Sequence, residues 1–394
     1  MLPAARQQAA IDVLDAWLKG QSLDQALSRW SRGARYAGSK DRRAVRDIVF
    51  DVLRNRGRAR ALGTSVVRTE SGRALVFGWL RLRGSDLGAV FTGLGHAPAP
   101  LDAEERRLLG ERPSAPITLD TPDWLLSLLR AEYGADTEPL LGAFSHRAPL
   151  YVRVNRDAAT AAERVAEARV ALAGDGIASE PVEGAVTALK ITEQGARLAQ
   201  CTAYLKGMVE PQDLSVQLAC AAVDWGAAQT VLDYCAGGGG KALAVAAATG
   251  RAVHVHDAEP RRMADLPARA ARAKAELVEW RAGATGPDRF DCVLCDVPCS
   301  GSGTWRRDPE ARWRLTLDRL RRLTEAQDAI LDSAARRVGQ GGRLIYMTCS
   351  LLQQENLDRI QAFLDRHKAA CLVQSQAWNP LTASDGFFLA EIKL

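Results

Sequence analysis

The sequence predicts an α/β protein in which a helical domain and a small α+β segment precede a doubly wound, mostly parallel sheet. Three observations predict this. The 394 residues exceed one typical domain of ~100–200 residues. The first hundred residues place apolar side chains at helical spacing. After residue 213, short apolar runs alternate with helix-like segments, which is typical of parallel strands covered by helices. We place the three domains at residues 1–115, 116–210 and 211–394.

Composition excludes several classes of protein. Hydrophobic residues make up 47% of the chain and charged residues 25%, an ordinary globular balance. No apolar run approaches the ~20 residues of a membrane span, and acids interrupt the start where a signal peptide would be apolar. Eight cysteines are too few for a disulfide-stapled secreted domain. We therefore expect a cytoplasmic protein with reduced thiols, no membrane segment and no metal.

The N-terminal domain is expected to be helical. Ser22 followed by Gln25 predicts a capped helix start. Between residues 39 and 56, apolar residues follow an i, i+3, i+4, i+7, i+8 pattern, so one stripe faces a core and much of the arginine faces outward. The Gly- and Pro-rich stretch 84–100 and a breaker cluster at Pro113–Pro116 mark the end of this domain.

Positive charge is concentrated in the same domain. Residues 1–100 contain 17 Lys and Arg against 8 Asp and Glu, whereas the whole chain has a net charge of only +5. A polyanion such as RNA would be attracted there by counterion release, and a solvated helix face that keeps the protein soluble is the alternative. Most of the excess comes from Arg29, Arg32, Arg35, Lys40, Arg42, Arg43, Arg46, Arg54, Arg56, Arg58 and Arg60.

After residue 120 the sequence predicts strands as well as helices. In the small α+β segment we expect a helix over 124–133, a strand over 150–155 and a helix over 158–171. The strands of the doubly wound sheet are expected at 230–234, 252–257, 290–296 and 343–348. In such sheets ligands bind beyond the carboxyl ends of the strands, so the residues that follow each strand are the candidates for function.

The first of these strands ends in four consecutive glycines, followed by Lys241 and a helix. Without β-carbons the backbone can approach a ligand closely, which implies a nucleotide-like cofactor. Asp257 ends the next strand, where a carboxylate that accepts from ribose hydroxyls belongs. The loose dinucleotide-binding pattern is also satisfied, and a turn without a ligand is an alternative. A P-loop fits worse, because Ala242 stands where magnesium needs Ser or Thr.

Two cysteines follow the later strands directly. Cys299 lies in the run Asp296-Val-Pro-Cys-Ser-Gly, and Cys349 lies in Thr-Cys-Ser. Because each sits in a turn at a strand's carboxyl end, both thiols are expected to point into the same crevice. Three other cysteines are interpreted as small buried hydrophobes, and the CxxC spacing of the last two lacks a second pair of zinc ligands: Cys235, Cys292 and Cys295.

In this order and spacing, the segments DYCAGGGGK, DVPCSGSGTWRRDPE and GGRLIYMTCSLLQQEN resemble the RsmB/Sun (NSUN-type) family of S-adenosylmethionine-dependent RNA 5-methylcytosine methyltransferases. The likeness covers most of residues 120–394. The basic helical start is similar to the NusB-like RNA-binding domain of bacterial members. The resemblance implies a class I Rossmann-like methyltransferase domain, an RNA-recognition-like α+β segment, S-adenosyl-L-methionine as cofactor, and small-subunit ribosomal RNA as substrate.

The resemblance also implies roles for single residues. Cys349 would attack carbon 6 of cytosine, and Cys299 would assist β-elimination and release of the methylated RNA. Asp296 would hydrogen-bond the ring near N3 and its amino group. Lys241 would lie beside the base, where a cation also favours the thiolate of Cys349. The cofactor would be held by Cys235, Ala236, Gly237, Gly238, Gly239, Gly240, Lys241, Asp257, Arg262 and Asp296.

The sequence departs from the family pattern at two places. Gly237 and Gly238 replace an Ala/Ser-Pro pair, which raises the entropic cost of ordering the loop. The stretch 280–286 has no match for the family's Asp that contacts adenine. Both departures predict weak cofactor binding. They motivate an alternative, an RNA-binding ribosome-assembly factor with weakened catalysis. A dinucleotide-dependent oxidoreductase would leave the two thiols unexplained.

A second cationic face is expected after the PCSG motif, where Trp305 and Trp313 lie among arginines. Aromatic side chains interleaved with arginine suit stacking of unpaired bases. The alternative is an amphipathic helix that packs its tryptophans inward. The arginines are Arg306, Arg307, Arg312, Arg314, Arg319, Arg321 and Arg322. We expect the protein to be a monomer.

Overall fold

The computed structural model describes residues 1–109, 119–155, 161–283 and 286–394, and these residues pack as two compact units. The first unit comprises Met1–Arg147 and Trp305–Arg314, and the second comprises Ala148–Thr304 and Leu315–Leu394. The three-domain division expected from the sequence stays a prediction, because one compact unit can hold more than one domain. The breaker cluster Pro113–Pro116 and the expected helix start at 158–160 lie outside the described residues.

The first unit is built from helices around an apolar core. Ser22 Oγ accepts a hydrogen bond from the N–H of Gln25 at 3.3 Å, which confirms the predicted cap. Gly63 lets two helices pack closely, since a Cβ there would lie 1.9 Å from the carbonyl oxygen of Ala74. The helices are α1 (Pro3–Leu18), α2 (Leu23–Gly33), α3 (Ser39–Arg54), α4 (Arg56–Val67), α5 (Gly72–Leu82), α6 (Leu87–Val90), α7 (Ala103–Leu108), α8 (Asp123–Tyr133), α9 (Thr137–Ala143) and α15 (Pro309–Arg314).

Helix α15 is far from the rest of this unit in sequence, yet buried side chains fix it there. Arg312 is fully buried and donates to the carbonyl oxygen of Arg54 at 2.8 Å. Trp313 Nε1 donates to the carbonyl oxygen of Leu53 at 2.8 Å. The buried Trp305 ring meets another aromatic ring edge-on, with 5.5 Å between centroids. The first unit therefore holds the chain segment that follows the PCSG motif.

The expectation of a second cationic face is wrong for three residues that follow the PCSG motif. Arg306, Arg312 and Trp305 are buried, because they anchor the segment to the helical core rather than facing solvent. Trp313 is half-buried and packs against the same core. The alternative, tryptophans packed inward, is correct. Four of the arginines are exposed: Arg307, Arg319, Arg321 and Arg322.

The second unit contains a four-stranded antiparallel sheet with the order β2-β3-β1-β4. The strand predicted over 150–155 is confirmed as β1, and the predicted helix that follows is described from residue 161 onward. These elements are β1 (Leu150–Val154), α10 (Ala161–Gly174), β2 (Ser179–Val182), β3 (Ala185–Ile191), α11 (Thr202–Leu205) and β4 (Val209–Pro211).

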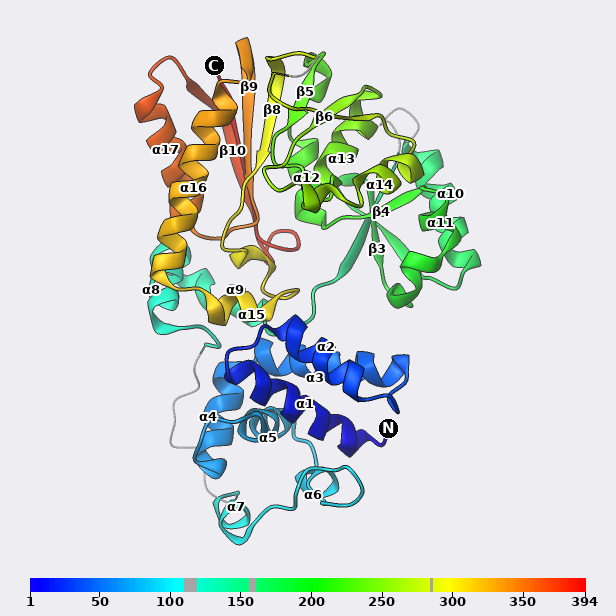
Figure 1. The fold of residues 1–394 in the computed structure, drawn as a ribbon, viewed down its shortest axis with the longest axis vertical. Coiled ribbons are helices and arrows are strands. Elements are labelled where there is room, and N and C mark those ends of the chain that lie inside the picture. The colour runs from blue at the N-terminus through cyan, green and yellow to red at the C-terminus, as the bar shows by residue number, and fades with distance from the viewer. Residues whose placement is uncertain (110–118, 156–160, 284–285) are drawn as a thin grey trace. The chain divides into compact units, whose positions relative to one another are not determined.

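The same unit contains a seven-stranded sheet with the order β10-β11-β9-β8-β5-β6-β7 (Figure 1). Strands β5 to β9 pair in parallel, and β11 pairs antiparallel with both β9 and β10. This confirms the doubly wound, mostly parallel sheet. Its elements are α12 (Leu214–Ala221), β5 (Val231–Asp233), α13 (Gly240–Thr249), β6 (Val253–Val255), α14 (Leu266–Ala273), β7 (Leu277–Glu279), β8 (Phe290–Asp296), α16 (Leu317–Ala335), β9 (Val338–Thr348), α17 (Leu357–Arg366), β10 (Cys371–Trp378) and β11 (Phe387–Lys393).

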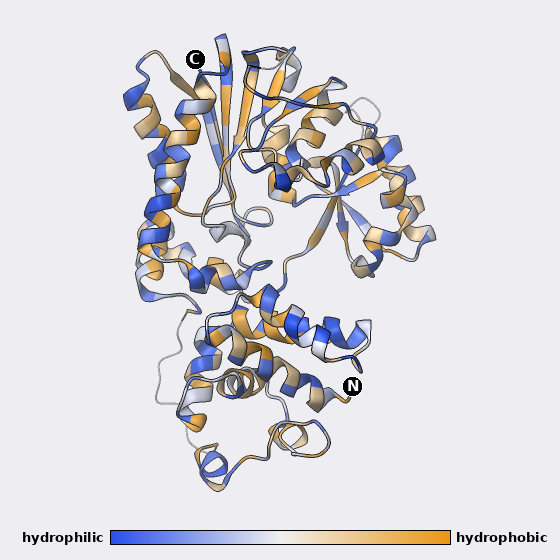
Figure 2. Ribbon diagram, viewed as in Figure 1, coloured by the Kyte–Doolittle hydropathy of each residue, from blue (hydrophilic) through white to orange (hydrophobic). Residues whose placement is uncertain are grey.

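Burial explains the apolar runs that located these strands. Strand β8 is buried from Cys292 to Cys295 and β9 from Leu344 to Thr348, whereas α16 carries a strongly hydrophilic face (Figure 2). The strand order reverses between β5 and β8, and ligands of such sheets bind at the carboxyl ends of the strands flanking that switch point.

None of the helices in the described ranges combines the length and the hydrophobicity that a membrane-spanning segment needs.

Candidate functional site

The glycine loop between β5 and α13 adopts a conformation that needs glycine. Gly237 and Gly239 have φ angles of +49° and +77°, in the left-handed region that side chains rarely adopt. A Cβ on Gly239 would lie 2.8 Å from the side chain of Leu266. Gly239 is also the N-cap of α13, so the loop leads directly into the positive end of that helix.

Asp257 fixes one side of this loop. Its carboxylate is 5% exposed and accepts a hydrogen bond from the N–H of Gly237 at 2.9 Å and another from the N–H of Glu259 at 2.9 Å. Arg262 lies 3.4 Å from the same carboxylate. The two residues that the sequence assigned to the cofactor are thus adjacent, and each carboxylate oxygen still has a lone pair for a ribose hydroxyl.

The other side of the loop is held by residues that the sequence did not single out. Arg269, on α14, donates to the carbonyl oxygen of Gly238 and pairs with the buried carboxylate of Glu210 at 2.8 Å. Gln212 donates to the carbonyl oxygen of Gly240 at 3.0 Å. These bonds restrain the loop at the positions where the family's proline is missing. No local pattern could have revealed them, because the partners come from distant elements.

A cavity of about 270 Å³ opens at the loop, and a buried acid lines it. Asp233, the last residue of β5, is 1% exposed, and neither carboxylate oxygen accepts a well-formed hydrogen bond from a described residue, although the N–H groups of Cys235 and Ala242 lie near. Burial, aided by Asp296, raises the pKa of Asp233 to about 7. Sequence reasoning missed this residue, although its place directly before the glycine loop was a signal.

Lys241 and Asp296 form an ion pair at the same edge of the sheet, with 2.6 Å between Nζ and Oδ2. Burial alone would lower the pKa of Lys241, but Asp296 outweighs it with help from Cys220 and Asp233, so the pKa is raised and the ammonium stays charged. Lys241 also lies over the ring of Phe387, 5.3 Å from its centroid.

The two cysteine motifs meet, as predicted from their positions after β8 and β9. Cys299 Sγ and Cys349 Sγ lie 3.3 Å apart, and both residues are partly exposed. The N–H of Gly303 donates to the carbonyl oxygen of Cys349 at 2.9 Å, so the two turns are also joined through their backbones. This arrangement brings both thiols within reach of one small planar ligand.

Hydrogen bonding and burial both act on the thiol of Cys299. The hydrogen bond with Cys349 and burial raise the pKa of Cys299 well above its usual value, with a further contribution from Glu355. These effects favour the protonated form of Cys299, and either sulfur can be the donor in the contact between the two. Cys292 and Cys295 are fully buried, which confirms their interpretation as packed side chains, and burial raises the pKa of each. The same interpretation is wrong for Cys235, which is partly exposed because it lies in the glycine loop and lines the cavity there.

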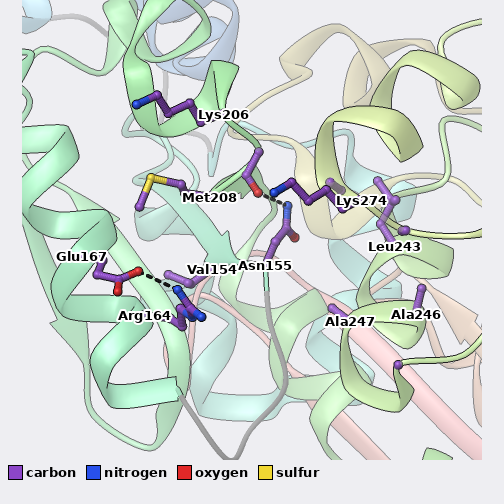
Figure 3. A pocket seen from close by; sticks show the side chains of 14 residues that line it. Val154, Asn155, Arg164, Glu167, Lys206, Met208, Leu243, Ala246, Ala247 and Lys274 are labelled. Carbon is purple, nitrogen blue, oxygen red and sulfur yellow. Dashed lines mark hydrogen bonds and ion pairs between the residues drawn. The ribbon is translucent and has the colours of Figure 1, made fainter.

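A larger cavity, of about 340 Å³, lies elsewhere in the second unit, between the end of β1 and helix α13 (Figure 3). Asn155 donates to the carbonyl oxygen of Gly207 there, and Arg164 pairs with Glu167 (Figure 3). The lining of this cavity does not include the glycine loop, whereas the 270 Å³ cavity is lined by that loop together with Asp233, Lys241 and Asp296. We therefore take the smaller cavity as the candidate site. In the described part of the chain, no cluster of His, Cys, Asp and Glu is suited to hold a metal ion.

The chain is similar to known proteins over most of its length. Residues 221–391 match the family described as 16S rRNA methyltransferase RsmB/F, and residues 121–196 match its ferredoxin-like domain. Ribosomal RNA small subunit methyltransferase B of Xanthomonas campestris is 30% identical over 405 residues, covering 92% of this chain and 88% of that protein. The protein of the same name from Vibrio cholerae is 32% identical over 287 residues, covering 68% of this chain. The match spans 64% of the length of the Vibrio cholerae protein, less than two thirds.

Solved structures share the fold. The crystal structure of PH0851 has a TM-score of 0.77 and 22% identity, covering 100% of this chain and 99% of that chain. NSun6 from Pyrococcus horikoshii, solved with SFG, has a TM-score of 0.57 and 15% identity, covering 69% of this chain and 98% of that chain.

Proposed function

The chain belongs to the RsmB/F family of 16S rRNA methyltransferases, and on this premise we propose that it transfers a methyl group from S-adenosyl-L-methionine to carbon 5 of a cytosine in small-subunit ribosomal RNA. The observation that carries the proposal is the pair of sulfurs, 3.3 Å apart, at the edge of the sheet where the glycine loop lies. A ribosomal RNA substrate implies a cytoplasmic reaction, and we expect a monomer.

The residues around the 270 Å³ cavity fit the cofactor. Asp233 is a buried carboxylate without a well-formed hydrogen bond, suited to the ammonium group of a methionine. Asp257 has lone pairs for ribose hydroxyls, and the backbone from Cys235 to Lys241 forms the cradle. When bound, S-adenosylmethionine supplies an electrophilic methyl group. No acid matching the family's adenine contact follows β7 in the described residues, so recognition of adenine rests on other groups.

The chain's own residues would activate the base. Cys349 adds to carbon 6 as a thiolate: the sulfur–carbon bond forms, the C5–C6 π pair shifts, and carbon 5 becomes nucleophilic. With the proton of the sulfur pair on Cys299, its S–H would donate to Cys349 Sγ and stabilise that thiolate before the attack. Lys241, charged and paired with Asp296, adds positive potential at this edge, while Asp296 is placed three residues before Cys299 to accept from the base.

Release would use the same hydrogen bond in the reverse direction. Once carbon 5 carries the methyl group, its proton leaves to water and the electron pair left behind re-forms the C5–C6 double bond. The bond between carbon 6 and Cys349 then breaks, and its electrons leave on sulfur. Cys299, still protonated, donates to that departing thiolate. In this way Cys299 assists elimination without forming a bond to the base.

A basic surface on the first unit supports an RNA substrate. Seven cationic side chains of α2, α3 and the turn between them are exposed. An open hollow of about 700 Å³ among them is lined by Trp30, Arg32, Arg42 and Arg46, a combination suited to gripping phosphates and stacking on a base. The seven residues are Arg29, Arg32, Arg35, Lys40, Arg42, Arg43 and Arg46.

Two measurements test the proposal. Bisulfite sequencing of cellular RNA with and without the gene should lose one methylcytosine in small-subunit ribosomal RNA when the gene is absent. Purified protein should transfer radioactive methyl from S-adenosylmethionine to that RNA. Tight RNA binding with no lost methylcytosine and no transfer would instead support the assembly-factor alternative.

A further inference from the structure

Glu355 lies between the two cysteine-bearing turns and is fully buried. Its carboxylate accepts from Ser300, through both the N–H at 2.8 Å and the hydroxyl, and from the hydroxyl of Ser350 at 2.5 Å. Ser300 follows Cys299 in the chain, and Ser350 follows Cys349. One side chain thus bonds the immediate neighbour of each reactive cysteine.

The surroundings of Glu355 fix it in turn. Gln327, on α16, donates to Glu355 Oε1 at 3.1 Å and to the carbonyl oxygen of Pro298 at 2.9 Å. Tyr346, on β9, donates its hydroxyl to the main-chain oxygen of Glu355 at 2.6 Å. The carboxylate therefore meets four donors from three segments, which compensates for its burial, since a buried charge with fewer donors would be costly.

We propose that Glu355 is a positioning residue that clamps the PCSG and TCS turns together and so sets the contact between Cys299 and Cys349. This inference rests on the proposed function for its consequence in catalysis, while the clamp itself is defined by geometry alone. Glu355 positions the two thiols through the two serines and the backbone.

The readout that reports the clamp directly is the effective concentration of one thiol toward the other. It is measured by equilibrating the full-length protein with reduced and oxidised glutathione and quantifying the Cys299–Cys349 disulfide by mass spectrometry. Formation of that disulfide transfers two electrons and two protons to oxidised glutathione, which yields two molecules of reduced glutathione. The measurement requires neither RNA nor S-adenosylmethionine.

Two variants and one control complete the test. Glu355→Ala should lower the effective concentration at least about tenfold and lower kcat about 100-fold, because small displacements of reacting groups have effects of that size. Cofactor affinity should stay within about twofold, since binding energy not involved in the clamp is unaffected. Glu355→Gln should be intermediate, because its amide oxygen still accepts from Ser300 N–H and Gln327, while its NH₂ group cannot accept from the hydroxyls. Glu391→Gln, at another buried glutamate that pairs with Arg343, should leave the thiol pair unchanged.

The outcomes separate the clamp from the proposed function. If Glu355→Gln and Glu355→Ala both keep the wild-type effective concentration, or if Glu391→Gln lowers it as much, the clamp is wrong. If the wild-type protein transfers no methyl group but the Glu355 variants lower the effective concentration, the clamp stands and the proposed function fails.

Discussion

The four-glycine loop should depend on Arg269 for its affinity toward S-adenosylmethionine. Arg269 donates to the carbonyl oxygen of Gly238 and is itself oriented by Glu210, which is 2% exposed. In the Arg269→Ala variant, Gly238 loses this anchor while Gly240 keeps its bond from Gln212. The loop then has to be ordered by the cofactor instead of by the protein.

The expected change in the Kd for S-adenosylmethionine follows from the free-energy cost of ordering the loop. Fixing the backbone of one residue costs about 1–2 kcal/mol, and glycine lies at the upper end because it has the most freedom to lose. A cost of about 1.4 kcal/mol corresponds to a tenfold change in Kd. Arg269→Ala should therefore raise the Kd about tenfold, and Arg269→Ala combined with Gln212→Ala should raise it about 100-fold.

Isothermal titration calorimetry with S-adenosylmethionine measures this, and Arg272→Ala provides a matched control. Arg272 pairs with the same Glu210 at 2.9 Å, but its contacts are to Glu210 and to the ring of Tyr204 rather than to the loop. The reasoning is refuted if Arg269→Ala binds within twofold of wild type, or if Arg272→Ala weakens binding equally.

Three further predictions concern other parts of the molecule. Cys349→Ala should abolish methyl transfer, whereas Cys299→Ala should accumulate a covalent protein–RNA adduct, visible as a gel-shifted, nuclease-sensitive band, because the departing thiolate loses its hydrogen-bond donor. Cofactor affinity should rise between about pH 6 and pH 8, because Asp233, with its pKa raised to about 7, must lose its proton to accept a cation; calorimetry in buffers of different ionisation enthalpy measures the released proton. A chain that begins at Ala148 should aggregate in light scattering, because Trp305 and Arg312 lose the helical unit that buries them.

Each of these has an outcome that would contradict it. If Cys349→Ala accumulates the covalent RNA adduct and Cys299→Ala does not, then Cys299 is the attacking group and Cys349 assists elimination. Asp233→Asn should remove the pH dependence of cofactor affinity, and if that variant keeps the dependence, another group is titrating. Lys241 stays charged over this pH range because its pKa is raised. If the chain that begins at Ala148 is monodisperse, Trp305 is buried there by residues other than those of the helical unit.

Local patterns in the sequence were sufficient for β1, β5, β6, β8 and the end of β9, and for the meeting of the thiols. Strand β8 occupies residues 290–296 as predicted, because a strand buried on both faces reads as one apolar run. Cys299 and Cys349 meet because the turns after neighbouring parallel strands share one edge of the sheet. Both features depend on residues that are close in sequence to a strand end.

Features that depend on distant partners could not be predicted. Arg269 lies 31 residues from the carbonyl group it holds, and nothing around it in sequence marks that bond. Trp305 looked like a base-stacking residue because its neighbours are arginines, but its exposure is decided by Phe144, in a different helical segment. Interleaved Arg and Trp suit a packed anchor as well as an RNA surface, so composition alone does not separate the two.

The surroundings of Cys299 support the roles proposed for Cys299 and Cys349 independently of the family resemblance. Cys299 is adjacent to Ser300, which bonds Glu355, and the hydrogen bond to Cys349, burial and this carboxylate all favour its protonated form. A protonated thiol can donate but cannot attack, which supports the proposed roles, with Cys299 as the donor and Cys349 as the nucleophile. In the Cys349→Ala variant the hydrogen bond between the sulfurs is lost, but burial and Glu355 still raise the pKa of Cys299. Cys299 should therefore be unable to replace Cys349 as the attacking group, even though its sulfur lies only 3.3 Å from that position.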